Sequence, residues 1–122
     1  MTLGEKRRLF TRLLPRLIDE MHRRGFEASL DEGFVGRSID KPSEDTPHRR
    51  DGGHLKGIAQ DINLFRCTHQ PAHVVGGCPN PDYLTQSEPH QPFGTFWTGL
   101  HPLCRWDGQD GNHYALYDGG VA

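Results

Sequence analysis

Two histidines and an aspartate in this chain have the side-chain types and the order of a metal site. His54 and Asp61 stand seven residues apart, and His113 follows near the other end of the chain. Imidazole nitrogens and a carboxylate oxygen are zinc ligands, and three protein ligands leave a fourth position open for water. An open position is typical of a catalytic metal. We therefore predict Zn2+ bound by His54, Asp61 and His113.

A fourth residue of the right type lies close to this set. Asp110 precedes His113 by three residues. A carboxylate that binds no metal, but lies this near to a ligand, can take a proton from a water molecule in the open position. The sequence therefore predicts a zinc hydrolase with Asp110 as its general base.

The spacing of His54 and Asp61 requires a bend in the chain. Side chains alternate between the two faces of a strand, so residues 54 and 61 would point to opposite faces of one straight strand. Gly57 can provide the bend, because glycine adopts backbone conformations that other residues avoid. We expect His54 on an entry loop and Asp61 on the polar face of a strand over Ile58–Phe65.

The composition predicts one small domain, residues 1–122, with many loops. Of the 122 residues 34% are hydrophobic, and there are 15 glycines and 9 prolines. The net charge is −2, but the first 25 residues are net basic and the remainder is net acidic. A basic helix could attract an anionic polymer; a solvated helix face is the interpretation we favour. Since no segment resembles a membrane span or a signal peptide, we expect a cytoplasmic product.

Periodicity predicts the main elements. Apolar residues recur every three to four positions over residues 2–24, which predicts an N-terminal helix capped by Thr2 and Glu5 and stopped at Gly25. Pro15 predicts a kink, or a late start to the regular helix. The other expected elements are a long surface loop over residues 31–53, a helix over residues 92–100, and strands at residues 26–30, 58–65, 83–85 and from 113 onward.

The segment from residue 66 to residue 81 resembles an insertion loop, and it contains Cys67, His69, His73 and Cys78. Three interpretations compete. The four side chains could bind a second, structural zinc, although their spacing matches none of the common zinc-finger patterns. Cys67 and Cys78 could form a disulfide. The interpretation we favour is an ordinary loop in which both thiols are reduced.

The candidate site residues resemble, in type and order, the LAS zinc peptidases of peptidoglycan. This family contains D-alanyl-D-alanine carboxypeptidases, and the chain is most similar to its small phage endolysins, which are L-alanyl-D-glutamate endopeptidases. The resemblance covers the chain from Gly25 to the end, and the N-terminal helix has a family counterpart. The matching positions are His54, Asp61, Asp110 and His113, together with residues 57–59, 62–65, 96–97 and 111–114.

The resemblance implies an α+β fold, in which a small antiparallel sheet has helices on one face and a zinc cleft on the other, as in LAS and hedgehog-like peptidases. It implies that the substrate is the stem peptide of peptidoglycan, and that Asp110 passes a proton from water to the leaving amine. Arg37 is the candidate for a substrate-binding arginine after the first strand, and Gly52 stands where the family often has serine or threonine. We expect a monomer without nucleic-acid or membrane partners, made in the host bacterium and acting on its cell wall.

Two other classes of function compete with the peptidase. A metal-dependent nuclease is suggested by Asn112-His113 and the other histidines, but it would need a basic surface near the metal, and the chain beyond residue 25 is net acidic. A non-catalytic wall-binding domain of the same fold is the second alternative. The presence of Asp110 argues against it, because a binding domain needs no general base.

Overall fold

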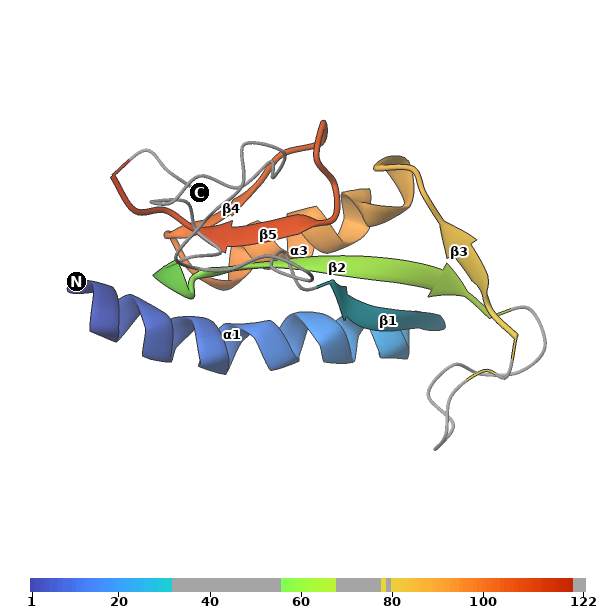
Figure 1. Cartoon of the computed structure of the whole chain (residues 1–122), viewed down its shortest axis with the longest axis horizontal. Helices are drawn as coiled ribbons and strands as arrows, with labels where there is room; N and C mark the ends of the chain where they lie inside the picture. Colours follow the sequence, from blue (N-terminus) through green and yellow to red (C-terminus); the bar gives the residue numbers. More distant parts are fainter. Residues whose placement is uncertain (32–55, 68–77, 79, 120–122) are drawn as a thin grey trace, which may run out of the picture.

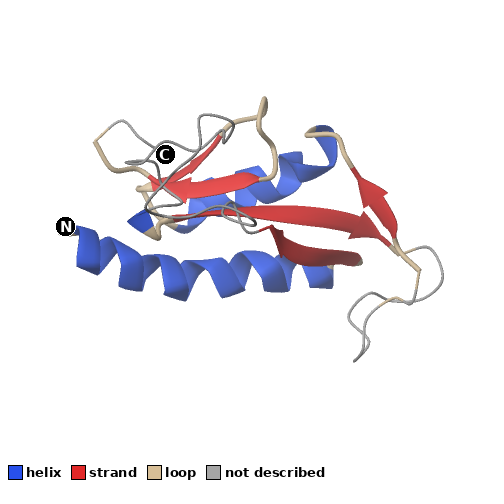
Figure 2. Ribbon diagram, viewed as in Figure 1, coloured by secondary structure: helices blue, strands red, loops and turns tan. Residues whose placement is uncertain are grey.

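The protein, described here by a computed structural model, has an antiparallel sheet with α1 and α3 on one side of it (Figures 1 and 2). The structure describes residues 1–31, 56–67, 78 and 80–119. The expected α+β class is confirmed, and no helix of these residues is long and apolar enough to cross a membrane. The described elements are α1 (Leu3–Arg23), β1 (Phe26–Asp31), β2 (Ala59–Arg66), β3 (Asp82–Leu84), the 3-10 helix η1 (Glu88–His90), α3 (Gln91–Leu100), β4 (Cys104–Trp106) and β5 (His113–Leu116).

Local capping chemistry sets both ends of α1. The Glu5 N–H donates to Thr2 Oγ1 (3.1 Å) and the Thr2 N–H donates to Glu5 Oε1 (2.9 Å), so the predicted capping box is confirmed. Gly25 follows the helix with a φ of +91°, a conformation that glycine adopts without strain. The helix already begins at Leu3 and continues through Pro15, so the late start, one of the two alternatives expected at Pro15, is wrong. Burial of the apolar stripe stabilises the turn that lacks a hydrogen bond.

The sheet is organised around β2. Its strand order is β1-β2-β5-β4, with antiparallel neighbours throughout. Strand β1 occupies one edge of β2 along Asp61–Arg66. Two strands share the other edge, because β5 pairs with Ala59–Asp61 and β3 pairs with Leu64–Arg66. Segments far apart in the sequence therefore lie side by side around β2 (Figure 1).

The core lies between the helices and one face of the sheet. Ile58, Ile62 and Leu64 share that face and are fully buried, as their spacing predicts. The predicted apolar stripe of α3 is core at Phe93 and Trp97, while Phe96 and Leu100 are partly buried against it. Trp97 Nε1 also donates to the carbonyl oxygen of Ala115 (3.1 Å). The other fully buried large side chains are Leu17, Met21, Phe93, Tyr114 and Leu116.

The sequence pattern does not predict β4, which is too short to show a period. Its last residue, Trp106, packs against Gly94 of α3. A Cβ at position 94 would lie 2.1 Å from the Trp106 ring, so only glycine permits this approach. Gly94 lowers the intrinsic helix propensity of α3, but it lets the helix pack closely onto β4.

A disulfide bond between Cys67 and Cys78 closes the segment that follows β2. The expectation that both thiols are reduced is therefore wrong, and disulfide sulfurs are not thiolate ligands for a structural zinc. The physical reason is the antiparallel pairing of β2 with β3, which brings both ends of the connecting segment together and leaves the two Cα atoms 5.8 Å apart. His69 and His73 lie outside the described residues. Cys104 is a free, buried cysteine.

Candidate functional site

Asp61 on β2 and His113 on β5 form the centre of the candidate site. They are Cα partners in the antiparallel pairing, so both side chains leave the sheet on the face opposite the helices. Nδ1 of His113 lies 3.0 Å from Oδ1 of Asp61, across 52 positions of sequence. The two side chains are 18% and 14% exposed, so water reaches the contact only in part. The structure thus brings two of the three predicted ligands together.

Backbone hydrogen bonds hold the start of β5 against β2. The Ile62 N–H donates to the carbonyl oxygen of Asn112 (2.8 Å), and the His113 N–H donates to that of Asp110 (3.1 Å). These bonds end the preceding turn and make His113 the first residue of the strand. The register that results is the one that sets His113 opposite Asp61.

A further carboxylate, which the sequence pattern does not reveal, stands in the same row. Asp31 on β1 is the other Cα partner of Asp61, so Asp31, Asp61 and His113 align across three neighbouring strands on one face. Like charges directly opposite each other on a sheet are destabilising. A cation bound near Asp61 would relieve this repulsion. Only the register identifies Asp31 as a neighbour, because no local pattern encodes which residues pair across strands.

Asp110 lies in the turn between β4 and β5, which its neighbours hold in place. The Gly111 N–H donates to Ser87 Oγ (3.0 Å), and Trp106 Nε1 donates to the Gly111 carbonyl oxygen (2.7 Å). A Cβ on Gly111 would lie 2.7 Å from the Cβ of Ser87, so this approach also requires glycine. The turn is thereby fixed next to His113, and Asp110 itself is exposed. Its role as a base stays a prediction.

His54 and Arg37 lie outside the described residues, so the third metal ligand and the substrate-binding arginine also stay predictions. Gly57 is described and has a φ of +75°, in the left-handed region that favours glycine. Strand β2 begins only at Ala59. The predicted bend at Gly57 is confirmed. The straight strand that carries Asp61 therefore does not extend back to residue 54, and the alternation of side chains along β2 does not apply to that residue.

Asp61 and His113 carry donor atoms of the types that zinc binds. Zinc binds imidazole nitrogen and carboxylate oxygen at about 2.0–2.2 Å, so two such donors in a tetrahedral site stand roughly 3.3 Å apart. The observed 3.0 Å between His113 Nδ1 and Asp61 Oδ1 is close to that separation. Within the described ranges no three His, Cys, Asp or Glu side chains converge on one point. His54, the third predicted ligand, lies outside those ranges.

The face that carries Asp61 and His113 continues along β2 to a group of residues we call the aromatic ledge: Asn63, Phe65 and Tyr83. Tyr83 on β3 is the Cα partner of Phe65, and the two ring centroids are 5.2 Å apart. The Tyr83 hydroxyl donates to Oδ1 of Asn63 (3.3 Å). The sequence indicates β3 but not this group of residues, because the group forms only where β3 pairs with the second half of β2.

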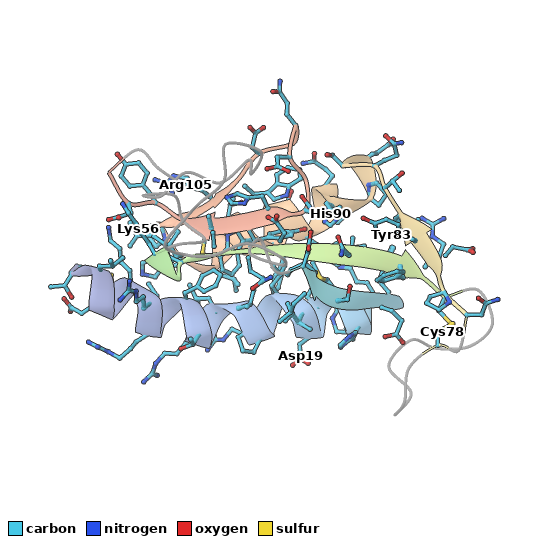
Figure 3. The ribbon with its side chains drawn as sticks, viewed as in Figure 1. Asp19, Lys56, Cys78, Tyr83, His90 and Arg105 are labelled. Atoms are coloured by element: carbon cyan, nitrogen blue, oxygen red, sulfur yellow. A yellow bond between two sulfur atoms is a disulfide. The ribbon has the colours of Figure 1, made fainter. Side chains whose placement is uncertain are left out.

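A buried polar pair supports the start of β5 from the helix side. Nδ1 of His90 lies 2.8 Å from the hydroxyl of Tyr114, and His90 is only 2% exposed. Burial lowers the pKa of His90 to about 4 and raises that of Tyr114, so both groups are neutral near pH 7. His90 is the last residue of η1 and directly precedes α3 (labelled in Figure 3). The pair therefore ties the helix start to the residue that follows His113.

Comparison of this chain with protein-family models, with curated proteins and with solved structures found no match.

Proposed function

We propose that this chain is a zinc-dependent peptidase that cleaves a peptide bond in the stem peptide of peptidoglycan. The observation that carries the proposal is the 3.0 Å contact between His113 Nδ1 and Asp61 Oδ1 on the face of the sheet opposite α1 and α3. These are the donor types that zinc takes in catalytic sites, and they belong to two of the residues that the LAS resemblance assigns to the metal. His54 and Asp110 complete that pattern in the sequence.

His54, Asp61 and His113 would hold the metal in this proposal. Bound zinc supplies a Lewis acid that polarises the scissile carbonyl and makes a water molecule acidic enough to ionise near neutral pH. The position of Asp31 opposite Asp61 supports cation binding, because two facing carboxylates favour a positive charge between or beside them.

Asp110 transfers the proton in the proposed reaction, first as a base and then as an acid. Its carboxylate accepts a proton from the attacking water, and the resulting acid delivers that proton to the nitrogen as the peptide C–N bond breaks. The hydrogen bonds of Gly111 to Ser87 and Trp106 limit how far this turn can move from His113, which supports a role that needs fixed geometry. Arg37 would bind a carboxylate of the substrate.

The architecture is compatible with this function. The helices cover one face of the sheet, and the candidate site lies on the other, which is the arrangement that the LAS resemblance implies. We propose that the zinc cleft and the LAS fold apply to this chain. It would act on the cell wall as a monomeric phage or prophage endolysin, either as an L-alanyl-D-glutamate endopeptidase or as a D-alanyl-D-alanine carboxypeptidase.

Incubation of the purified protein with peptidoglycan, with and without a chelator, tests the proposal. We expect hydrolysis that the chelator abolishes and added zinc restores. Mass spectrometry of the products then identifies the bond, because a new free N-terminus on D-glutamate indicates the endopeptidase and released D-alanine indicates the carboxypeptidase. DNA incubated in parallel tests the nuclease alternative. Sedimentation with peptidoglycan without any release of fragments would contradict the proposal in favour of a wall-binding domain.

A further inference from the structure

The face of the sheet opposite α1 and α3 extends well beyond the Asp61–His113 pair. Residues of one strand face repeat every second position, at about 3.3–3.4 Å per residue. Asn63 therefore lies one step, about 7 Å, along β2 from Asp61, and Phe65 lies about 13 Å away. Strand β3 joins the same edge of β2 as β5, so Tyr83 continues the line that starts at His113.

Tyr83 is an exposed aromatic residue in a fixed position. It is 54% exposed, although its ring contacts Phe65 and its hydroxyl is bonded to the Asn63 side chain. Figure 3 shows Tyr83 on β3 beside the second half of β2. An exposed aromatic ring next to a side-chain amide combines an apolar surface with hydrogen-bonding groups.

Covalent and polar contacts hold this part of the sheet together. The disulfide between Cys67 and Cys78 joins the end of β2 to the segment that leads into β3. The Cys78 N–H also donates to Oε1 of Glu27 on β1 (2.8 Å). Three strands are thus connected around Tyr83. A side chain held in this way loses little conformational freedom when a ligand stacks against it.

The charge of this face limits the kind of ligand. Glu27, Asp31 and Asp61 all share the face with the aromatic ledge, as the register of β1 with β2 shows. Three carboxylates disfavour a polyanion such as nucleic acid. A neutral ligand with one apolar face and several hydrogen-bonding groups fits better, and an N-acetylated pyranose sugar has this character: its axial C–H groups stack on an aromatic ring, while its hydroxyl and acetamido groups bind an amide.

We infer that Asn63, Phe65 and Tyr83 form a saccharide subsite, which binds the amino-sugar ring that carries the stem peptide. The inference rests on the proposed peptidase function and deepens it. The sugar is joined to the peptide through a lactyl group, so one amino acid and that group separate the ring from an L-alanyl-D-glutamate bond. At about 3.5 Å per residue the ring centre stands roughly 10 Å from that bond. A point roughly 10 Å along β2 from Asp61 lies between Asn63 and Phe65. A D-alanyl-D-alanine bond lies three residues further, beyond the ledge, so the subsite favours the endopeptidase.

Binding of a peptide-free sugar tests the subsite without depending on turnover. The probe is N,N′-diacetylchitobiose, a neutral disaccharide, titrated into the whole protein and followed by NMR chemical shifts. We expect shifts at Asn63, Phe65 and Tyr83 in the wild type. Tyr83→Ala should weaken binding about tenfold, as for other central aromatic contacts. Tyr83→Phe should stay within about threefold, because the ring remains. Tyr117→Ala, which removes an exposed tyrosine near β4, is the matched control and should bind like the wild type.

The outcomes separate this inference from the proposed function. Absence of ledge shifts in the wild type overturns the subsite, whatever the variants do, and so does equal affinity in Tyr83→Ala. Peptidoglycan hydrolysis is measured on the same preparation. Hydrolysis without sugar binding overturns the subsite alone. Sugar binding at the ledge without hydrolysis overturns the peptidase proposal and leaves a glycan-binding surface.

Discussion

His113 and Asp61 face each other across the β5–β2 pairing, with Nδ1 and Oδ1 3.0 Å apart. The contact joins the first residue of β5 to the strand at the centre of the sheet, on the face opposite α1 and α3. An imidazole and a carboxylate in this arrangement can orient each other or share a metal ion. Loss of zinc on replacement of one partner distinguishes these two roles.

Replacing His113 with alanine should remove the metal. If His113 is one of three protein ligands, its loss should lower zinc affinity by roughly 100-fold or more, since even second-shell partners of ligands change affinity by 10–100-fold. Zinc content by elemental analysis and affinity by calorimetry measure the effect. His22→Ala removes a histidine of α1, on the other side of the sheet, and should bind zinc like the wild type. Undiminished zinc binding by His113→Ala would show that the metal assignment is wrong.

Asp110→Asn separates chemistry from metal binding. Asparagine has nearly the same shape but cannot act as a base, so hydrolysis of peptidoglycan should fall roughly 100-fold or more while the zinc content stays the same. Asp19→Asn changes an exposed aspartate of α1 and should keep full activity. An active Asp110→Asn protein would contradict the base role. A zinc-free one would mean that Asp110 is a ligand instead.

Removal of the Cys67–Cys78 disulfide should lower stability but leave zinc binding intact, because neither cysteine is among the predicted ligands. The bond spans a sequence separation of 11, for which loop-closure entropy corresponds to about 3 kcal/mol of unfolding free energy. Thermal unfolding of the double serine variant measures this loss. A reducing agent should lower the melting temperature of the wild type and not that of the variant. Loss of zinc from the variant would instead indicate a metal site in this segment.

His90 should make stability depend on pH in the mildly acidic range. Burial lowers its pKa to about 4, below its ordinary value of 6.5, so between these values the unfolded chain binds a proton that the folded protein does not. The contribution of neutral His90 to the free energy of unfolding is complete above about pH 6.5. It is lost as the pH falls toward 4, and the loss amounts to at most about 3 kcal/mol. Denaturant unfolding of the wild type and of His90→Gln from pH 7.5 to 4 measures the difference. Equal pH dependence of the two proteins would contradict the assignment.

Several elements were predictable because their signals are local. The Thr2–Glu5 capping box and Gly25 mark the ends of α1 within one helical turn, and the alternation of Ile58, Ile62 and Leu64 identifies the buried face of β2. These signals depend on backbone sterics, capping hydrogen bonds and side-chain period, which a short stretch of sequence carries by itself.

What the sequence alone determined about the site was its chemistry: the residue types and order of His54, Asp61, Asp110 and His113. The tertiary structure decided which of the described side chains meet, including the Cys67–Cys78 disulfide, the facing of Asp31 with Asp61, and the contact of Tyr83 with Phe65. Each of these depends on strand order and register. The alternation along β2 already places Asp61 on the polar face, but which residues of β1, β3 and β5 stand opposite β2 depends on pairing between segments far apart in the sequence, which no local pattern contains.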